Sequence, residues 1–153
     1  MRCLSLLIML IPLVVVAQSS EETILTGKLN RSAFDQPWAI EWKQAERDYK
    51  PDSLIIEKLK SYPGKLSFAI VLGTWCSDSR DMVPLFFKIA EICGFNYELI
   101  GVNREKECPQ KDCSTWDFTF VPTIVVLKEG KEIGRIVETV KVSVEKDLWE
   151  MVK

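Results

Sequence analysis

The sequence predicts an α/β fold in which a central mixed sheet of about four strands is flanked by helices. The first observation is the apolar run KLSFAIVLGTW at residues 65–75, which is typical of a strand covered on both faces. The second is a helical repeat of apolar residues over residues 77–93. The third is a strand pattern at residues 95–103 and another over residues 121–138. This alternation of strands and helices indicates an α/β domain.

Two helices are expected before the first strand. In residues 36–50, side chains at i, i+4, i+7 and i+11 form one apolar face, namely Trp38, Trp42, Ala45 and Tyr49. We interpret the tryptophans as packing residues rather than as a platform for a ligand. A second helix is predicted from Pro51, because Pro and Asp52 suit a first helical turn. Residues 36–63 therefore form an N-terminal helical extension to a core of residues 64–153.

The core elements follow in the order strand, helix, strand, hairpin, helix. A helix that joins residues 65–75 to residues 95–103 crosses between two strands, so these strands are expected to run parallel. The hairpin is predicted from its turn at Glu129 and Gly130. A last helix is expected to begin near Ser143 and to present three apolar side chains to the core, those of Val144, Leu148 and Val152.

The composition limits the classes of function. The chain has 153 residues, of which 47% are hydrophobic and 27% charged, which suits a single domain, assigned to residues 36–153. Its net charge of −2 argues against nucleic-acid binding, because nucleic-acid-binding proteins concentrate Lys and Arg on one face. The chain has no histidine, which excludes Ser-His-Asp triads, Cys-His dyads and histidine metal sites. We therefore expect neither a metal nor a cofactor, and cysteine becomes the main candidate for chemistry.

Residues 1–17 have the pattern of a secretory signal peptide. Arg2 precedes an apolar run over residues 4–16, and Ala17 suits the end of a cleavage site. The run is shorter than the ~20 residues of a spanning helix, so we expect no membrane span in the mature chain. An uncleaved anchor is the alternative. A polar segment, residues 18–35, follows, and the expected location is the oxidising periplasm or extracellular space.

Four short motifs follow one another in a specific order. They are TWCSDS at residues 74–79, Pro84 five residues later, FVPT at residues 120–123 and GKEIGRIVE at residues 130–138. Each motif is weak alone, but their order and spacing together resemble the thioredoxin superfamily, in particular exported bacterial thioredoxin-like proteins. The resemblance covers about residues 64–153 and implies a thioredoxin-like fold.

The resemblance also implies a reactive thiol at Cys76. In the family, the Trp-Cys turn ends the central strand and opens the following helix, so Cys76 is expected at a helix N-terminus. Backbone N–H groups and the helix dipole stabilise a thiolate there, and the thiolate is the nucleophilic form of cysteine. The resemblance makes Pro122 a cis proline that faces Cys76, with the backbone of Val121 offered to an extended substrate. Trp75 and Thr123 complete the expected substrate-binding residues.

Ser79 is a departure from the family, because it stands at the position of the second cysteine of a CxxC site. A dithiol enzyme releases a mixed disulfide with its second sulfur, and a serine hydroxyl cannot perform that step. The hydroxyl can still donate a hydrogen bond to the Cys76 thiolate and favour the ionised form. Asp78 opposes ionisation and Arg80 supports it, so the net effect stays open. The sequence thus predicts a CxxS monothiol site in which Cys76 and Ser79 are the catalytic residues.

Three cysteines follow Cys76 in the chain. Cys93 is expected at the far end of the predicted helix, roughly 25 Å from Cys76 at ~1.5 Å per residue, and on its apolar face, as a buried and inert thiol. Cys108 and Cys113 lie five positions apart in the irregular segment 104–118. We expect them to form a structural disulfide in an exported protein. The alternative is that this loop folds toward Cys76, where one of its sulfurs resolves a mixed disulfide.

Two functions stay open at this point. The leading hypothesis is an exported monothiol protein whose Cys76 forms mixed disulfides with protein or small-molecule thiols and is released by an external thiol. The alternative is a redox-inactive binding module that holds a partner peptide near Pro122. A thiol peroxidase is a weaker third hypothesis, since a lone reactive cysteine can form a sulfenic acid. The partner, the direction of electron flow and the oligomeric state are not predicted.

Overall fold

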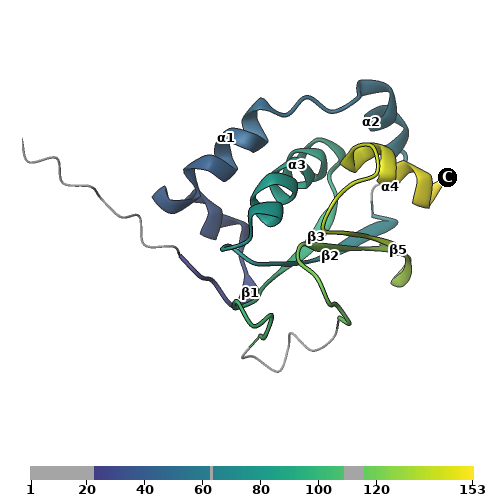
Figure 1. The fold of residues 1–153 in the computed structure, drawn as a ribbon. Helices are drawn as coiled ribbons and strands as arrows, with labels where there is room; N and C mark the ends of the chain where they lie inside the picture. Colours follow the sequence, from purple (N-terminus) through teal and green to yellow (C-terminus); the bar gives the residue numbers. More distant parts are fainter. Residues whose placement is uncertain (1–22, 63, 109–115) are drawn as a thin grey trace, which may run out of the picture.

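The computed structural model describes residues 23–62, 64–108 and 116–153, which form a five-stranded mixed sheet with helices packed against it (Figure 1). The strand order across the sheet is β1-β3-β2-β4-β5. The strands are β1 (Gly27–Leu29), β2 (Leu66–Leu72), β3 (Asn96–Gly101), β4 (Thr123–Lys128) and β5 (Lys131–Val137). The α-helices are α1 (Ile40–Asp48), α2 (Ser53–Leu59), α3 (Ser77–Cys93) and α4 (Val144–Val152).

The predicted α/β thioredoxin-like fold is confirmed, with one strand more than expected. Strand β2 is the middle strand, parallel to β3 and antiparallel to β4, and β5 is antiparallel to β4. The additional strand is β1, which pairs antiparallel with β3 at one edge of the sheet. It arises in the segment that the sequence suggests to be a polar lead-in, residues 18–35. A strand of three residues is too short to show an alternating pattern.

The helical extension becomes part of the domain core. Two short 3₁₀ helices, η1 (Arg31–Asp35) and η2 (Pro37–Ala39), lead into α1. Helix α1 packs against α3, and α2 packs against α4. Phe34 and Trp42 are buried with their ring centroids 5.0 Å apart, which confirms that Trp42 is a packing residue.

The four α-helices lie together over one face of the sheet (Figure 1). Side chains alternate along a strand, so Phe68, Ile70 and Leu72 of β2 point into this helical layer and are at most 2% exposed. Their burial on that face, and the burial of Ala69 and Val71 on the other, explains why β2 is apolar at every position except Ser67.

A second, smaller apolar cluster lies on the opposite face of the sheet. We call it the loop-side cluster, and it consists of Val71, Ile100, Val102 and Val121. Residues that follow β2 and residues of the connection between β3 and β4 pack against it, namely Trp75, Cys76, Cys108, Trp116 and Phe118. Within the described part of that connection there is no helix, in agreement with the irregular segment predicted there.

The β4–β5 hairpin has the predicted turn. Glu129 and Gly130 both have positive φ, 53° and 78°, which is the backbone of a type I′ turn. This turn has the twist that two antiparallel strands require, so β5 returns directly beside β4.

A buried carboxylate in α4 forms hydrogen bonds within the helical layer. Glu145, in the first turn of α4, is 3% exposed and accepts a hydrogen bond from the Tyr49 hydroxyl at 2.5 Å. It also accepts one from the backbone N–H of Asp52 at 3.1 Å. Burial disfavours the charged carboxylate, but these hydrogen bonds outweigh it and hold the pKa of Glu145 below its ordinary value. Glu145 thereby ties α4 to the segment between α1 and α2.

None of the helices in the described ranges has the length and hydropathy of a membrane-spanning segment.

Candidate functional site

Cys76 lies at the N-terminus of α3, directly after the turn that follows β2. It occupies the N-cap position, its backbone N–H donates to the Gly73 carbonyl at 3.0 Å, and its own carbonyl accepts from the Arg80 N–H at 3.1 Å. The thiol is free and partly exposed. A helix N-terminus carries partial positive charge from its unpaired N–H groups, which stabilises a thiolate relative to a thiol. This is the position that the resemblance implied for the nucleophile.

The turn before β4 faces Cys76. The Val121–Pro122 peptide bond is cis, and the Cys76 thiol donates to the Val121 carbonyl oxygen, with 3.4 Å from Sγ to oxygen. The Pro122 carbonyl accepts from the Glu138 N–H at 2.8 Å. Two segments that are 45 positions apart therefore meet at the sulfur of Cys76.

Trp75 is held in one orientation beside Cys76. Its indole N–H donates to the Val102 carbonyl at 3.0 Å, and its ring packs on the loop-side cluster. A Cβ at Gly73 would lie 2.7 Å from the ring, so the turn requires glycine there. The guanidinium of Arg104 lies 5.5 Å from the ring centroid. The Trp75 ring is thus fixed against the sheet at the position that precedes Cys76.

Ser79 supports the turn from inside the protein. Its side chain is fully buried, and its hydroxyl oxygen accepts a hydrogen bond from the Gly73 N–H at 3.2 Å. The hydrogen bonds of the described residues include none between Ser79 and Cys76, although the sequence suggests one. Ser79 therefore helps to position Cys76 through the Gly73 turn.

Thr123 is also buried, and it stabilises the turn that precedes β4. It is 1% exposed, and its hydroxyl donates to the Phe120 carbonyl at 2.6 Å. Of the four expected substrate-binding residues, the backbone of Val121 contacts the Cys76 sulfur and Trp75 lines the same groove as Cys76, whereas Pro122 and Thr123 are buried.

A groove of about 440 Å³ opens beside Cys76, and much of its wall is formed by the N-terminal helices. Trp38, Ile40 and Glu41 line one side, and Arg80 lines the other with Cys76. The Arg80 guanidinium and the Glu41 carboxylate form an ion pair at 3.0 Å across it. Ile40 is 65% exposed and therefore presents apolar surface at the groove.

The N-terminal segment reaches the same groove. The Thr74 hydroxyl donates to the Thr23 carbonyl at 2.5 Å and accepts from the Leu25 N–H at 3.1 Å. These bonds hold residues 23–25 beside the turn that carries Cys76, and Thr23 forms part of the groove wall. The sequence indicates neither contact, because both join residues about 50 positions apart.

Apart from Trp75 and Cys76, the residues that line the groove are not among the site residues that the sequence predicts. The sequence predicts that Trp38 is a packing residue. In the structure Trp38 contacts the core, and it also lines the groove. The sequence contains two indications of this groove. Ile40 lies off the apolar face of its helix, and Arg80 lies one helical turn after Cys76.

The other cysteines occupy different environments. Cys93 ends α3, is 5% exposed, and its burial raises the pKa of the thiol to about 11. Cys108 is disulfide-bonded and contacts the loop-side cluster, whereas Cys76 and Cys93 are free. Cys113 lies outside the described residues, so its pairing with Cys108 stays a prediction.

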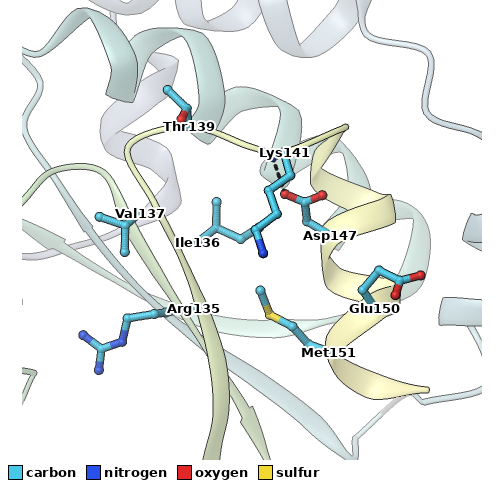
Figure 2. Close-up of a pocket in the computed structure, with 8 residues that line it drawn as sticks. All are labelled: Arg135, Ile136, Val137, Thr139, Lys141, Asp147, Glu150 and Met151. Atoms are coloured by element: carbon cyan, nitrogen blue, oxygen red, sulfur yellow. Dashed lines mark hydrogen bonds between the residues drawn. The ribbon is translucent and has the colours of Figure 1, made fainter.

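A separate cavity of about 620 Å³ lies between β5 and α4 (Figure 2). The carboxylate of Asp147 accepts from the backbone N–H groups of Lys141 and Val142, at 2.6 Å and 3.2 Å. The side chains of Lys141 and Met151 point into the cavity (Figure 2). Cys76 does not line this cavity, and Asp147 is engaged in holding the loop before α4.

Known proteins resemble this chain in sequence and in fold. No protein-family model matches the chain. The chain is 27% identical over 127 residues to thioredoxin H9 of Arabidopsis thaliana, a match that covers 82% of this chain and 77% of that protein. The crystal structure of a protein of unknown function from Pseudomonas aeruginosa matches with a TM-score of 0.57 at 16% identity, over 78% of this chain and 76% of that one. An HIV epitope scaffold matches 64% of this chain and 60% of its own, with 17% identity and a TM-score of 0.49.

The similarity to thioredoxin H9 supports a place for the chain in the thioredoxin-like superfamily, and the bacterial structure shows the likeness of fold. A thioredoxin relative suggests thiol–disulfide redox chemistry, with thiols or disulfides as substrates. The thiol of Cys76 is free, lies at a helix N-terminus and opens to a groove, and a thiolate at such a position can act as a nucleophile.

Proposed function

We propose that this protein is a monothiol thioredoxin-like protein that forms mixed disulfides through Cys76. The Cys76 thiolate attacks one sulfur of a substrate disulfide, a new S–S bond forms, and the other substrate sulfur leaves as a thiolate. An incoming thiolate then attacks the mixed disulfide and frees Cys76. Ser79 has no sulfur with which to complete a dithiol cycle within the CxxS motif.

The observation that carries the proposal is the position of the Cys76 sulfur. The sulfur belongs to the N-cap residue of α3, and its thiol donates a hydrogen bond to the Val121 carbonyl oxygen. An open groove lies on one side of it. The groove offers apolar surface from Trp38 and Ile40 to the residues that flank a substrate cysteine. A bound peptide therefore has surface to contact as well as a sulfur to exchange with.

We also propose that the protein is exported, with residues 1–17 removed as a signal peptide. This proposal rests on the sequence pattern alone, and these residues lie outside the described residues. Expression in a bacterium and N-terminal sequencing of the exported protein tests it. The expected first residue is Gln18, and a product that keeps Met1 in the membrane fraction contradicts it.

The experiment for the activity is the labelling of each cysteine with iodoacetamide as a function of pH, with mass spectrometry to identify the alkylated residue. Cys76 is expected to react fastest, and Cys76→Ser to abolish mixed-disulfide formation with a disulfide-linked peptide. The matched control is Cys93→Ser, which removes a buried thiol and leaves the exchange unchanged. Full exchange activity in Cys76→Ser would falsify the proposal. Slow labelling of Cys76 at every pH favours a redox-inactive binding module.

A further inference from the structure

Cys108 and Cys76 contact the same small apolar surface. Both side chains pack against the loop-side cluster. Val71 of this cluster is paired with Ile100 on β3 and with Thr123 on β4, two residues after Val121. Since neighbouring strands are about 4.8 Å apart, the cluster is roughly 10 Å wide. The free Cys76 and the disulfide-bonded Cys108 therefore pack on one apolar patch of the sheet.

The backbone that leads to Cys108 is tied to the turn that faces Cys76. After β3, the Asn103 side chain accepts from the Glu107 N–H at 2.7 Å, and the Glu107 carbonyl accepts from the Asn103 N–H at 3.0 Å. The Lys106 ammonium donates to the Thr119 carbonyl at 2.8 Å and lies 4.8 Å from the ring centroid of Phe120. These contacts anchor residues 103–107 beside the segment that precedes Val121, and they keep Cys108 at the same end of the sheet as Cys76.

Among the described residues, Ser79 and Cys93 do not fit the role of a resolving partner for Cys76. Ser79 carries no sulfur, and its hydroxyl oxygen is bonded to Gly73. Cys93 is buried at the opposite end of a 17-residue helix, roughly 25 Å away at ~1.5 Å per residue. A disulfide requires Cα atoms within about 7 Å, so Cys93 is out of reach.

We propose that Cys76 and the Cys108 disulfide exchange with each other, so that Cys108 resolves mixed disulfides formed at Cys76. The inference rests on the proposed function, because it requires Cys76 to be the nucleophile. A sulfur of the protein itself, in place of the external thiol, then releases Cys76 from the mixed disulfide. The disulfide at Cys108 is then a redox group rather than a staple of the loop.

Two equivalents of an external thiol first reduce the disulfide at Cys108 and are themselves oxidised to a disulfide, and from that state the exchange balances. Starting from the reduced protein, Cys76 attacks the substrate disulfide and the first substrate sulfur leaves as a thiolate. The Cys108 thiolate attacks the Cys76 sulfur, a Cys76–Cys108 bond forms, and the second substrate sulfur leaves. The sulfur that is bonded to Cys108 in the structure then attacks Cys108 and releases Cys76. One substrate disulfide is reduced to two thiols, and the protein ends with a free Cys76 and a disulfide at Cys108, which is the state described here.

The test follows the lifetime of an adduct at Cys76. The fully reduced protein is mixed with one equivalent of 5,5′-dithiobis(2-nitrobenzoate), quenched with acid at successive times, and mapped by mass spectrometry. In the unchanged protein the Cys76 adduct is expected to decay with release of a second thionitrobenzoate. In Cys108→Ser the adduct is expected to persist at least tenfold longer, while Cys93→Ser behaves as the unchanged protein. An equal lifetime in Cys108→Ser overturns the proposal.

A second variant protects the test against misfolding of Cys108→Ser. This variant is Cys113→Ser, which keeps the thiol of Cys108. Position 113 lies outside the described residues, and the sequence suggests Cys113 as the partner of Cys108. A peptide linked through Cys76 and Cys108 is expected to accumulate, because the sulfur that would cleave it is gone. Absence of this linked peptide, with a Cys76 adduct present, overturns the relay. Absence of any Cys76 adduct contradicts the proposed function itself, so the two failures are distinguishable.

Discussion

The Ser79 hydroxyl accepts a hydrogen bond from the Gly73 backbone N–H at 3.2 Å, and this bond spans the turn that carries Cys76. The residue at the second-cysteine position is therefore fully buried and bonded to the backbone beneath the nucleophile. Ser79 therefore holds the turn in place. Where a CxxC protein has a redox-active sulfur, this protein has a hydroxyl oxygen that accepts a structural hydrogen bond.

Ser79→Ala is expected to destabilise the protein by about 1–3 kcal/mol, because it leaves the buried Gly73 N–H without an acceptor. Thermal unfolding checks the stability, and the alkylation rate of Cys76 is expected to change only a few-fold. Ser79→Cys is expected to restore a dithiol site, in which the introduced sulfur oxidises with that of Cys76 to a disulfide detectable by peptide mapping. Unchanged stability in Ser79→Ala contradicts the role of this hydrogen bond.

Ile40→Asn is expected to slow exchange with a disulfide-linked peptide without affecting the intrinsic reactivity of Cys76, because the new side chain is uncharged. The exposed Ile40 offers apolar surface to the groove, and its loss removes about 1 kcal/mol of binding, which corresponds to roughly fivefold in rate. Comparing the peptide rate with the iodoacetamide rate isolates the groove. The matched control is Leu54→Asn, another exposed apolar residue in a first helical turn, 74% exposed and outside the groove. Equal slowing in both variants rules out a specific contribution of the groove.

Cys93 is expected to be inert toward alkylation at neutral pH. Burial raises the pKa of its thiol to about 11, so the thiolate is rare below that pH. In the folded protein its labelling is expected to rise only above about pH 10, whereas in urea it is expected to follow an ordinary cysteine at about 8.5. Rapid labelling of Cys93 in the folded protein at pH 8 contradicts its assignment as a core residue.

The stability of the protein is expected to fall in acid through Glu145. The lowered pKa of this carboxyl means that the unfolded chain takes up the proton first, so its contribution is complete above about pH 4.3 and is lost as the pH falls further. Glu145→Gln is expected to cost about 1–3 kcal/mol at pH 7. The difference from the unchanged protein is expected to shrink below pH 4, measured by urea unfolding. A constant difference across this range contradicts the assignment.

Tyr49→Phe examines the same contact from the other side. Burial and the neighbouring Glu145 raise the pKa of Tyr49, so its contribution is complete below about pH 10 and falls above it. Loss of a hydrogen bond to a charged group is expected to cost about 1.5–3 kcal/mol in urea unfolding at pH 7. Tyr62→Phe is the matched control, because within the described ranges no hydrogen bond of the Tyr62 hydroxyl is found. Equal costs in both variants contradict a specific role of the Tyr49–Glu145 contact.

The long elements of the fold are predictable because their patterns extend over many residues. The central strand β2 follows from seven residues covered on both faces, and α3 has the predicted bounds, although it contains Pro84. The hairpin follows from Glu129 and Gly130. Strand β1 is not predictable, since its three residues acquire their conformation by pairing with β3.

The candidate site also contains some residues that the sequence identifies and others that it does not. Cys76, Trp75 and Val121 are identified by local motifs, because the thioredoxin-like turn and the cis proline depend on a few adjacent residues. The groove is not, because Ile40 and Glu41 reach Cys76 only through packing of α1 against α3. The partner of Ser79 is also decided by packing, since its buried hydroxyl meets Gly73 rather than Cys76.

The sequence by itself determined the α/β order of elements, the single sulfur of the CxxS motif and its position at a helix N-terminus. Periodicity and turn chemistry act over a few residues, so they can be read in one dimension. Only the tertiary structure decided that Cys76 and Cys108 share the loop-side cluster, and that Arg80 pairs with Glu41 beside the thiol. Such contacts join residues about 30–40 positions apart, and they exist because burial of apolar surface brings the strands and helices that carry them together.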